Sequence, residues 1–369
     1  MVYEPTIDLS RRIKHAVAAG FGRAVRSSGG GWRFFAGRTS IVFYHGIWPA
    51  GAPALARFEG VELDRLHRDL STLAAHFDFV SLEDLLRYNR DEQAREQPIL
   101  AVCFDDGCDM IRSGAADVLN ALGVPATMFV VTACVDNRHL MWMHKLQAVT
   151  VTRGAERLLQ AYNGLMARTG AGPQIGARGE LTAAVWCWPM DRKEEYVDAL
   201  YQACDMPPVE AYLEEYRPYM TWGDLRTWIE MGHTVGLHTR SHPFCDRLRA
   251  AELEAEIVAP AGELRRELRI DALPFAYPFG NRLAAGCEAE VADEAGLACM
   301  LGVGGLNRRG TDPRRLDRVA GEDGLDHSLF GKPVLEAMIQ TAWPQARPRP
   351  ALAVRHRQPR AHGRRGRRA

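Results

Sequence analysis

Ten residues decide the fold of this chain: Pro98-Ile-Leu-Ala-Val-Cys-Phe-Asp-Asp-Gly107. The mostly apolar run 99–104 predicts a buried parallel strand. Two adjacent carboxylates, Asp105 and Asp106, stand at its carboxyl end, where Gly107 permits the backbone to turn. They can serve one site only if the strand ends there, because successive strand residues point to opposite faces. An ordinary Asp-Gly turn is the competing interpretation.

A second stretch, Thr234-Val-Gly-Leu-His-Thr-Arg-Ser-His-Pro243, is a short apolar strand that leads into two histidines. Neutral imidazole is the commonest metal ligand, and the spacing of His238 and His242 lets both converge on one ion if a turn follows the strand. A carboxylate would complete the site. Two histidines and one aspartate leave coordination positions open for water and substrate, which is typical of a catalytic metal. Capping or surface positions are the alternative for these histidines.

With both stretches in this order, the chain resembles the polysaccharide deacetylase (NodB-homology) family, carbohydrate esterase family 4. Phe104-Asp-Asp-Gly107 matches the first motif of that family and His238-Thr-Arg-Ser-His242 the second. Phe275-Ala-Tyr-Pro-Phe-Gly280 stands where the family carries an aromatic groove wall. The resemblance covers approximately residues 40–340. It implies an α/β fold, a distorted (β/α) barrel, and a metal-dependent hydrolase that removes an acetyl group from an N-acetylated polysaccharide, oligosaccharide or glycolipid intermediate.

The resemblance also implies roles for individual residues. Asp105 would be the general base, and Asp106, His238 and His242 would hold a divalent metal, Zn²⁺ as the first choice and Co²⁺ or Ni²⁺ as alternatives. The metal would lower the pKa of a bound water whose proton the base accepts. A backbone N–H in the loop after the groove strand would help to stabilise the oxyanion. The substrate-binding candidates are His45, Tyr277, Phe279, Gly280 and Arg318.

Two elements of the family pattern are incomplete. The late Leu-x-His element that supplies the general acid has one candidate, Leu325-Asp-His327, for which a capping histidine on the last helix is the alternative. The arginine expected before the groove proline is missing, because Phe275-Ala276 stands there, and Arg318 is the candidate to replace its contact with the base. Two other functions therefore stay open: a sugar-binding pseudoenzyme of the same fold, and a hydrolase of another non-peptide amide or ester.

Strand-like and helix-like segments alternate along the chain, which predicts about seven parallel strands in a sheet or barrel. Their carboxyl ends would meet at one mouth. The first strand, 40–46, would bring His45 to that mouth, either as a substrate contact or as a buried structural histidine. The other expected strands are 99–104, 125–132, the segment before His238, 273–279, 298–303 and 316–319; the expected helices are 61–76, one that begins at Ser81, 110–122, 221–232, 249–268 divided at Pro260, 287–295 and 328–341.

Residues 136–220 interrupt this alternation. The segment is too long for a structureless loop, so we expect a helical cap on the carboxyl face of the barrel. Its tryptophans, Trp142, Trp186 and Trp188, could stack on sugar rings, but packing in the core of the cap is the more common use. We expect His144 to be structural and not a metal ligand.

The formal net charge of the chain is zero, but its charges are unevenly distributed. Residues 345–369 contain nine arginines and no acidic residue, so the remainder holds 37 basic against 46 acidic side chains. This composition predicts a disordered basic tail behind an acidic body. The eight cysteines form no Cys-x-x-Cys pair, and the N-terminus carries no secretory pattern. We therefore expect free thiols and a cytoplasmic location.

Residues 7–25 combine apolar and basic positions at the spacing of an amphipathic helix. Such a helix could make peripheral contact with anionic lipid or pack on its own domain, and the second use is the more common. We predict an acetylated carbohydrate as the partner of the fold and no specific nucleic-acid partner. The expected division is an N-terminal segment and linker (1–39), a barrel (40–344) that includes the cap, and the basic tail (345–369).

Overall fold

The computed structural model describes residues 9–27, 34–35, 37–53, 57–90, 97–284 and 286–336. Within these ranges seven parallel strands close into a barrel, in which β1 pairs with β5 on one side and with β11 on the other. The predicted (β/α) barrel is thereby confirmed. The barrel strands are β1 (Arg38–Tyr44), β5 (Ile99–Phe104), β6 (Ala126–Val130), β7 (Thr234–Leu237), β8 (Leu273–Ala276), β9 (Leu297–Val303) and β11 (Leu316–Ala320).

Short strands extend this arrangement at its margins. β4 (Asp78–Phe79) pairs parallel with β5, and β10 (Asn307–Arg308) pairs antiparallel with β1. A separate two-stranded sheet joins β2 (Gly46–Trp48) to β3 (Gly60–Glu62) directly after the end of β1. These additions leave the closed ring of parallel strands intact.

The barrel wall separates two hydrophobic cores, because side chains alternate along each strand. In β5 all six residues are buried. Ile99, Ala101 and Cys103 belong to one core, whereas Leu100 and the residues that follow it at every second position belong to the other. The strand is therefore covered on both faces, which explains why its sequence is continuously apolar.

Two of the helices around the barrel begin at the capping residues that the sequence predicts. The Asp84 N–H donates to Ser81 Oγ (3.0 Å) and the Asp224 N–H to Thr221 Oγ1 (3.1 Å). The segment predicted as one helix over 249–268 is divided by a π-helical turn, and Pro260 lies in the first turn of its second half, where a missing N–H costs little. The helices are α2 (Leu63–Ala74), α3 (Leu82–Arg90), α4 (Ala116–Ala121, after a π-helical turn at Ile111–Ala115), α10 (Trp222–Glu230), α11 (Ala250–Leu253), α12 (Ala259–Leu268) and α13 (Cys287–Glu294).

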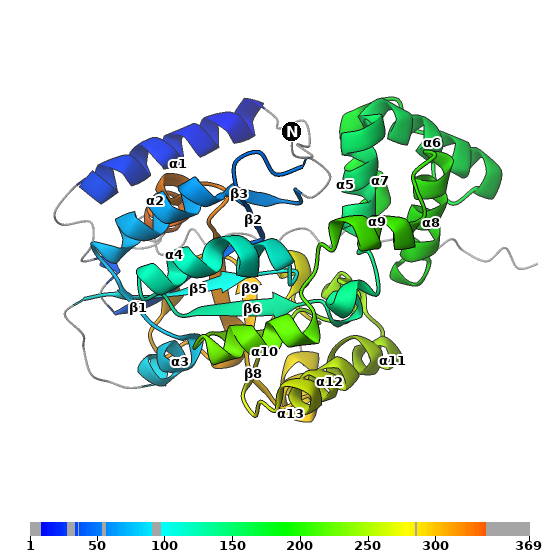
Figure 1. Ribbon diagram of the computed structural model, residues 1–369. Coiled ribbons are helices and arrows are strands. Elements are labelled where there is room, and N and C mark those ends of the chain that lie inside the picture. Colours follow the sequence, from blue (N-terminus) through cyan, green and yellow to red (C-terminus); the bar gives the residue numbers. More distant parts are fainter. Residues whose placement is uncertain are drawn as a thin grey trace, which may run out of the picture.

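The insertion between β6 and α10 forms a helical lobe beside the barrel, drawn in green in Figure 1. Trp188 is buried there between Tyr162 (ring centroids 5.7 Å apart) and Tyr196 (5.1 Å), as expected for core packing. Trp186 is different, because 38% of it is exposed. The helices of this cap are α5 (Trp142–Arg153), α6 (Ala155–Thr169), α7 (Arg178–Trp186), α8 (Met190–Ala203) and α9 (Val209–Tyr216).

The N-terminal helix α1 (Leu9–Ser27) packs on the short helix α14 (Leu325–Ser328). A Cβ at Gly22 would overlap the backbone of Asp326, so glycine permits the close approach, and Arg26 Nε lies 2.7 Å from Asp326 Oδ1. Of the two alternatives for the amphipathic segment, the structure thus shows packing on its own domain. The described residues include no helix long and apolar enough to cross a membrane.

The prediction of a last helix over 328–341 is wrong at its start. A four-residue helix begins at Leu325, directly after Gly324 (φ 84°) turns the chain, and already ends at Ser328. Residues 332–336 are helical again. The rest of the predicted helix and the whole tail 345–369 lie outside the described residues.

Candidate active site

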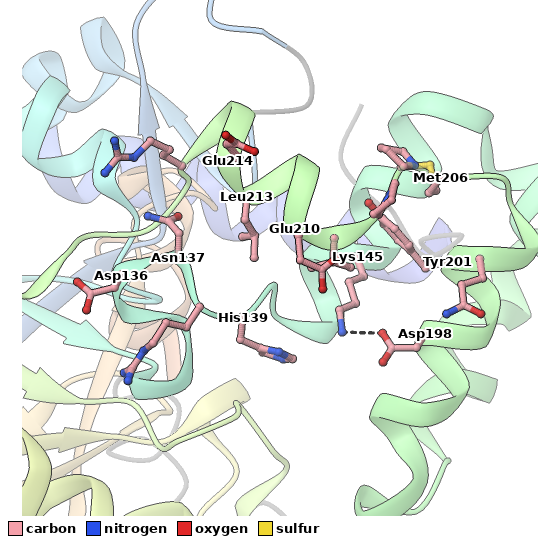
Figure 2. A pocket seen from close by; sticks show the side chains of 16 residues that line it. Asp136, Asn137, His139, Lys145, Asp198, Tyr201, Met206, Glu210, Leu213 and Glu214 are labelled. Carbon is pink, nitrogen blue, oxygen red and sulfur yellow. Dashed lines mark hydrogen bonds and ion pairs between the residues drawn. The ribbon is translucent and has the colours of Figure 1, made fainter.

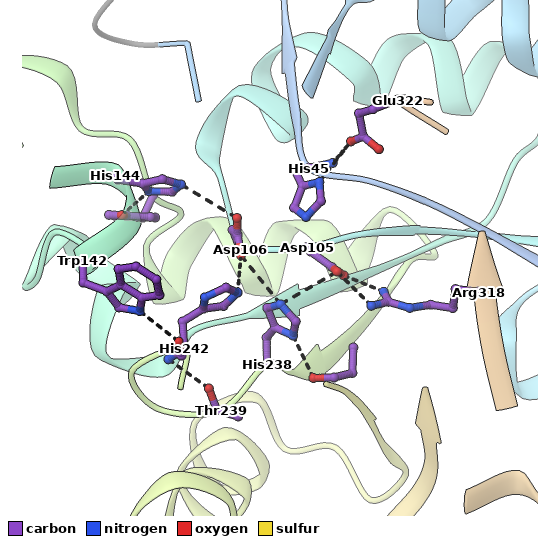
Figure 3. A network of polar contacts seen from close by, with 12 residues as sticks. His45, Asp105, Asp106, Trp142, His144, His238, Thr239, His242, Arg318 and Glu322 are labelled. Atoms are coloured by element: carbon purple, nitrogen blue, oxygen red, sulfur yellow. Dashed lines mark hydrogen bonds and ion pairs between the residues drawn. The ribbon is translucent and has the colours of Figure 1, made fainter. Parts of the chain in front are cut away.

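The two adjacent carboxylates separate at the point where β5 ends. Asp106 (φ 71°) and Gly107 (φ 69°) both adopt left-handed backbone conformations, which are uncommon for a non-glycine residue. The Asp105 N–H still donates to the Tyr44 carbonyl (2.9 Å) and so continues the pairing of β5 with β1. The turn aims Asp105 at Arg318 and Asp106 at His242, and His238 lies within 3.8 Å of both carboxylates (Figure 3).

Asp106 meets both predicted histidines. Its Oδ1 lies 3.7 Å from His238 Nε2 and 3.5 Å from His242 Nε2, and all three residues are buried. One ligand atom from each lies within 4.8 Å of the others. These separations exceed hydrogen-bond length and suit ligands that each bind one ion at about 2.0–2.2 Å. The structure thus brings together the three residues expected to bind a metal.

The loop that carries the histidines is held in a strained shape. Thr239 (φ 66°) and His242 (φ 62°) are both left-handed, and the His242 N–H donates to Thr239 Oγ1 (3.0 Å). Glu256 accepts hydrogen bonds from the Ser241 N–H (2.9 Å) and hydroxyl (2.7 Å). Strain of this kind persists only where surrounding contacts determine the backbone, which is common at functional sites.

A hydrogen bond to the backbone selects the tautomer of His238. Its Nδ1 lies 2.8 Å from the Ala276 carbonyl oxygen, which can only accept, so Nδ1 carries the proton. Nε2, the nitrogen that faces Asp106, therefore presents its lone pair. A backbone carbonyl that orients an imidazole in this way is the usual support of a metal-binding histidine.

The charges of these residues fit a bound cation. Burial raises the pKa of Asp106 to about 7, an effect that His45 opposes and Asp105 reinforces. Burial lowers the pKa of His238 to about 4 and that of His242 well below its ordinary value, so both imidazoles are neutral. Asp106 Oδ1 and His242 Nδ1 are buried without a hydrogen-bond partner among the described residues. One oxygen and two neutral nitrogens form a donor set for a zinc-like ion.

Asp105 has a cationic partner within the chain. Arg318 from β11 binds it with two hydrogen bonds, Nη1 to Oδ1 (2.7 Å) and Nη2 to Oδ2 (2.9 Å). Burial alone would raise the pKa of Asp105, but Arg318 together with His238 and His45 outweighs it, so this pKa lies below its ordinary value. The predicted contact with the base is present. Arg318 is only 1% exposed and lies over the Phe43 ring, so it positions Asp105, and its burial does not support the prediction that it binds substrate.

His45 lies at the barrel mouth, directly after β1, and pairs with Glu322. Its Nδ1 is 3.2 Å from Glu322 Oε1, which also accepts the His45 backbone N–H. Burial alone would lower the pKa of His45, but Glu322 outweighs it, so this pKa lies well above its ordinary value. The charge of His45 contributes to the lowered pKa of Asp105 and opposes the raised pKa of Asp106. The protonated His45 therefore differs from His238 and His242, which are neutral.

The loop after β8 contributes through its backbone and through one ring. Tyr277 is fully buried with its hydroxyl toward Glu288 (3.4 Å), so its side chain points away from the mouth and the prediction that it binds substrate is not supported. Phe279, left-handed at φ 58°, places its ring 4.7 Å from the His242 ring. The Tyr277 and Gly280 N–H groups donate within the fold and Pro278 has none, which leaves the Phe279 N–H without an acceptor among the described residues.

The structure places His327 elsewhere. It lies within α14, and its ring stacks on that of His15 from α1 (centroids 3.7 Å apart). Burial lowers its pKa, and the charges that act on it are those of His15, Asp323 and Lys332. No contact within the described residues joins it to the carboxylates. The alternative of an N-terminal cap is also wrong, because Gly324 occupies that position.

One residue at the site was expected to have only a structural role. His144 from α5 has its Nε2 3.8 Å from Asp106 Oδ2, while its Nδ1 lies 2.6 Å from the Tyr219 hydroxyl and its ring stacks on Phe58. Burial lowers its pKa well below the ordinary value, so it is neutral. The position of His144 in the sequence could have indicated that it lies at the site. It belongs to α5, which is the first α-helix after β6 and starts near the carboxyl end of that strand.

A cavity of about 880 Å³ lies between residues 136–139 and the cap helices α8 and α9 (Figure 2). Its polar lining includes Lys145, whose Nζ lies 2.6 Å from Asp198 Oδ1. None of the residues placed at the metal centre lines it. We locate the candidate active site by its convergent donors and not by this cavity.

Comparison with known proteins agrees with the motifs. The family model described as polysaccharide deacetylase matches residues 180–299, a range that includes His238, His242 and Phe279 but not the two adjacent carboxylates. A search of the curated proteins gives no match.

Several solved structures are similar in fold. Deacetylase PplD of Streptococcus pyogenes, solved with acetate, is 14% identical, with 77% of this chain and 92% of that one covered at a TM-score of 0.48. IcaB of Ammonifex degensii is 16% identical (84% and 97% covered, TM-score 0.46). The BpsB deacetylase domain of Bordetella bronchiseptica is 14% identical (77% and 96% covered, TM-score 0.46). The match thus makes residues 180–299, about a third of the chain, similar to polysaccharide deacetylases, which are hydrolases that act on a carbon–nitrogen bond.

Proposed function

We propose that this protein removes the acetyl group from an N-acetylated sugar by metal-assisted hydrolysis. One observation carries the proposal: two adjacent buried carboxylates have opposite environments, one paired with Arg318 and the other facing two neutral histidines. Asp106, His238 and His242 would hold a divalent cation, with Zn²⁺ as the first choice. When bound, such an ion polarises the acetyl carbonyl and lowers the pKa of a water molecule.

The chain supplies the proton transfers. Asp105, held ionised and oriented by Arg318, accepts the proton of the attacking water. The Phe279 N–H is the backbone donor available to the oxyanion. His45, kept protonated by Glu322, donates a proton to the leaving nitrogen as the carbon–nitrogen bond breaks. Water thus provides one carboxylate oxygen of acetate, and the sugar leaves as a free amine.

His45 and Asp105 are well placed for these complementary roles. β1 and β5 pair in parallel register, with Tyr44 opposite Phe104, so the residues that follow them emerge side by side at the barrel mouth. Their environments push their pKa values in opposite directions, which is the arrangement of an acid and a base that work together. We therefore propose His45 in place of His327 as the general acid.

Acetate release from metal-loaded protein tests this function, with Asp105→Asn beside the wild type. We expect turnover to fall roughly 10²–10⁴-fold, as for loss of a general base. Because Asp105→Asn leaves the Arg318 guanidinium unpaired, the matched variant is Asp105→Asn with Arg318→Met, and both must keep their metal and their circular dichroism. Turnover by folded Asp105→Asn at the wild-type rate would contradict the proposal.

The same experiment separates the alternatives. A sugar-binding pseudoenzyme would release no acetate from the wild type and would bind acetylated sugar equally well with Asn at position 105. A hydrolase of another amide or ester would turn over acetylated model compounds but no acetylated saccharide.

A further inference from the structure

Trp186 occupies an unusual position in the cap. It is the last residue of α7, and 38% of it is exposed, whereas Trp142, Trp188 and Trp228 are buried. Its ring contacts Phe244 (centroids 5.4 Å apart), in the loop after the histidines, and Phe279 (5.5 Å), in the loop after β8. Packing of the cap interior does not explain a tryptophan that reaches out to two barrel loops.

These rings form a continuous row that ends at the metal centre. Phe279 stacks on Phe244 (4.3 Å, 20° between the ring planes) and contacts the ring of His242 at 4.7 Å. Phe244 is buried and Phe279 is half-buried, so Trp186 is the most exposed ring of the row. A molecule that reaches His242 along this row would pass over Phe279 and Trp186.

The backbone at Trp186 is held by two cations. Lys193, itself 1% exposed, donates to the Val185 carbonyl (2.6 Å) and the Trp186 carbonyl (3.4 Å), and Arg247 donates to the Trp186 carbonyl as well. Carbonyl oxygens at a helix C-terminus attract cations. The exposed ring is therefore fixed to a rigid element, which is what a preorganised binding surface requires.

Resting on the proposed function, we propose that Trp186 and Phe279 form a second sugar subsite, which stacks on the pyranose ring next to the acetylated one. Aromatic faces accept the apolar face of a sugar, and the groups around the row suit its hydroxyls: the exposed Arg247 guanidinium and the exposed Asp246–Asn281 pair (3.1 Å). A lipid chain on the same rings would desolvate these polar groups without replacing their hydrogen bonds. The subsite would favour oligosaccharides over a single acetylated sugar.

The test compares a pentamer of N-acetylglucosamine with the monomer, in metal-loaded full-length protein. We expect Trp186→Ala to lower kcat/KM for the pentamer roughly threefold to tenfold and to leave the monomer unchanged. Trp186→Phe should keep most of the pentamer activity. The control is Val151→Ala, which removes another exposed apolar side chain of the same cap. Equal losses on both substrates, or no loss on either, would overturn the subsite.

Affinity measured by calorimetry separates this inference from the proposed function. If the wild type binds the pentamer and Trp186→Ala weakens that binding, but no acetate is released, the subsite stands and the proposed activity fails. If acetate is released while pentamer affinity is unchanged in Trp186→Ala, the activity stands and the subsite fails. Absence of pentamer binding by the wild type also overturns the subsite, as does binding to phosphatidylglycerol vesicles that depends on Trp186, which would assign the surface to lipid.

Discussion

Asp105 and Asp106 are neighbours in sequence, and both are buried, yet the structure treats their charges in opposite ways. Asp105 receives a bidentate guanidinium, and its pKa is lowered. Asp106 receives no cationic side chain within bonding distance among the described residues, and its pKa is raised. A buried carboxylate is stable only when its charge is compensated. The chain supplies that compensation for Asp105, and a bound metal would supply it for Asp106.

Loss of the Arg318 guanidinium, which compensates the charge of Asp105, should have the largest effect on stability. In Arg318→Met the buried carboxylate of Asp105 has no partner, and removal of one member of such a pair costs about 3–5 kcal/mol. Urea unfolding with and without the substitution measures this difference in free energy. Asp105→Asn combined with Arg318→Met should recover part of it, because neither partner is then left charged.

The pH dependence of that loss has a definite sign. The depressed pKa of Asp105 contributes stability above its unfolded pKa, and this stability is lost as pH falls through the folded value. In Arg318→Met the strongest of the influences that lower this pKa is lost, while burial still raises it, so the pKa of Asp105 should rise. The stability deficit should therefore be full at neutral pH and shrink as the pH falls and the carboxyl of the variant takes up a proton. A deficit that grows toward acid pH would contradict this interpretation of the pair.

The pairing of His45 with Glu322 predicts a shift in the alkaline limb of activity. Glu322 raises the pKa of His45, so the wild type should keep its acid protonated well above pH 6.5. In Glu322→Gln the strongest of the influences that raise this pKa is lost, while burial still lowers it, so the pKa of His45 should fall and turnover should decrease by about tenfold for each pH unit above it. A pH profile of kcat/KM measures the shift, with Asp323→Asn, an exposed neighbour, as the control. Identical alkaline limbs in Glu322→Gln and wild type would exclude His45 as the acid.

The smallest effect is expected at His327. A phenylalanine there keeps a ring against His15, so stability should change by no more than about 0.5 kcal/mol. Turnover of His327→Phe should stay within about twofold of the wild type, because the structure places no part of the site beside it. A fall of about 10²-fold or more, with the fold intact, would return the role of general acid to His327.

The barrel and the convergence of Asp106, His238 and His242 were predictable because they depend on local patterns. A continuous apolar run that ends in polar residues marks a buried parallel strand and its carboxyl end, and such ends meet at one mouth. That rule places Asp106 beside His238 although they lie in different parts of the chain. The family resemblance then indicates what these residues do.

The errors arose where a role depends on distant partners or on side-chain direction. The family pattern suggested that Arg318 contacts Asp105, which the structure shows, but no spacing in the sequence reveals that its side chain is buried and so unsuited to bind substrate. Tyr277 follows a strand of the mouth, but its ring turns into the core, where it meets Phe275 edge-on at 4.9 Å. His327 fits a family pattern, yet a four-residue helix packed under α1 takes it away from the site.

Metal content per chain tests most directly the claim that a cation completes the site of Asp106. Purified protein would be loaded with Zn²⁺, dialysed and measured for the wild type, Asp106→Ala, His238→Ala and Asp105→Asn. We expect one tightly held ion in the wild type and in Asp105→Asn, and none in Asp106→Ala or His238→Ala. A wild type that holds no Zn²⁺, Co²⁺ or Ni²⁺, or an ion that stays bound in Asp106→Ala, would contradict the claim.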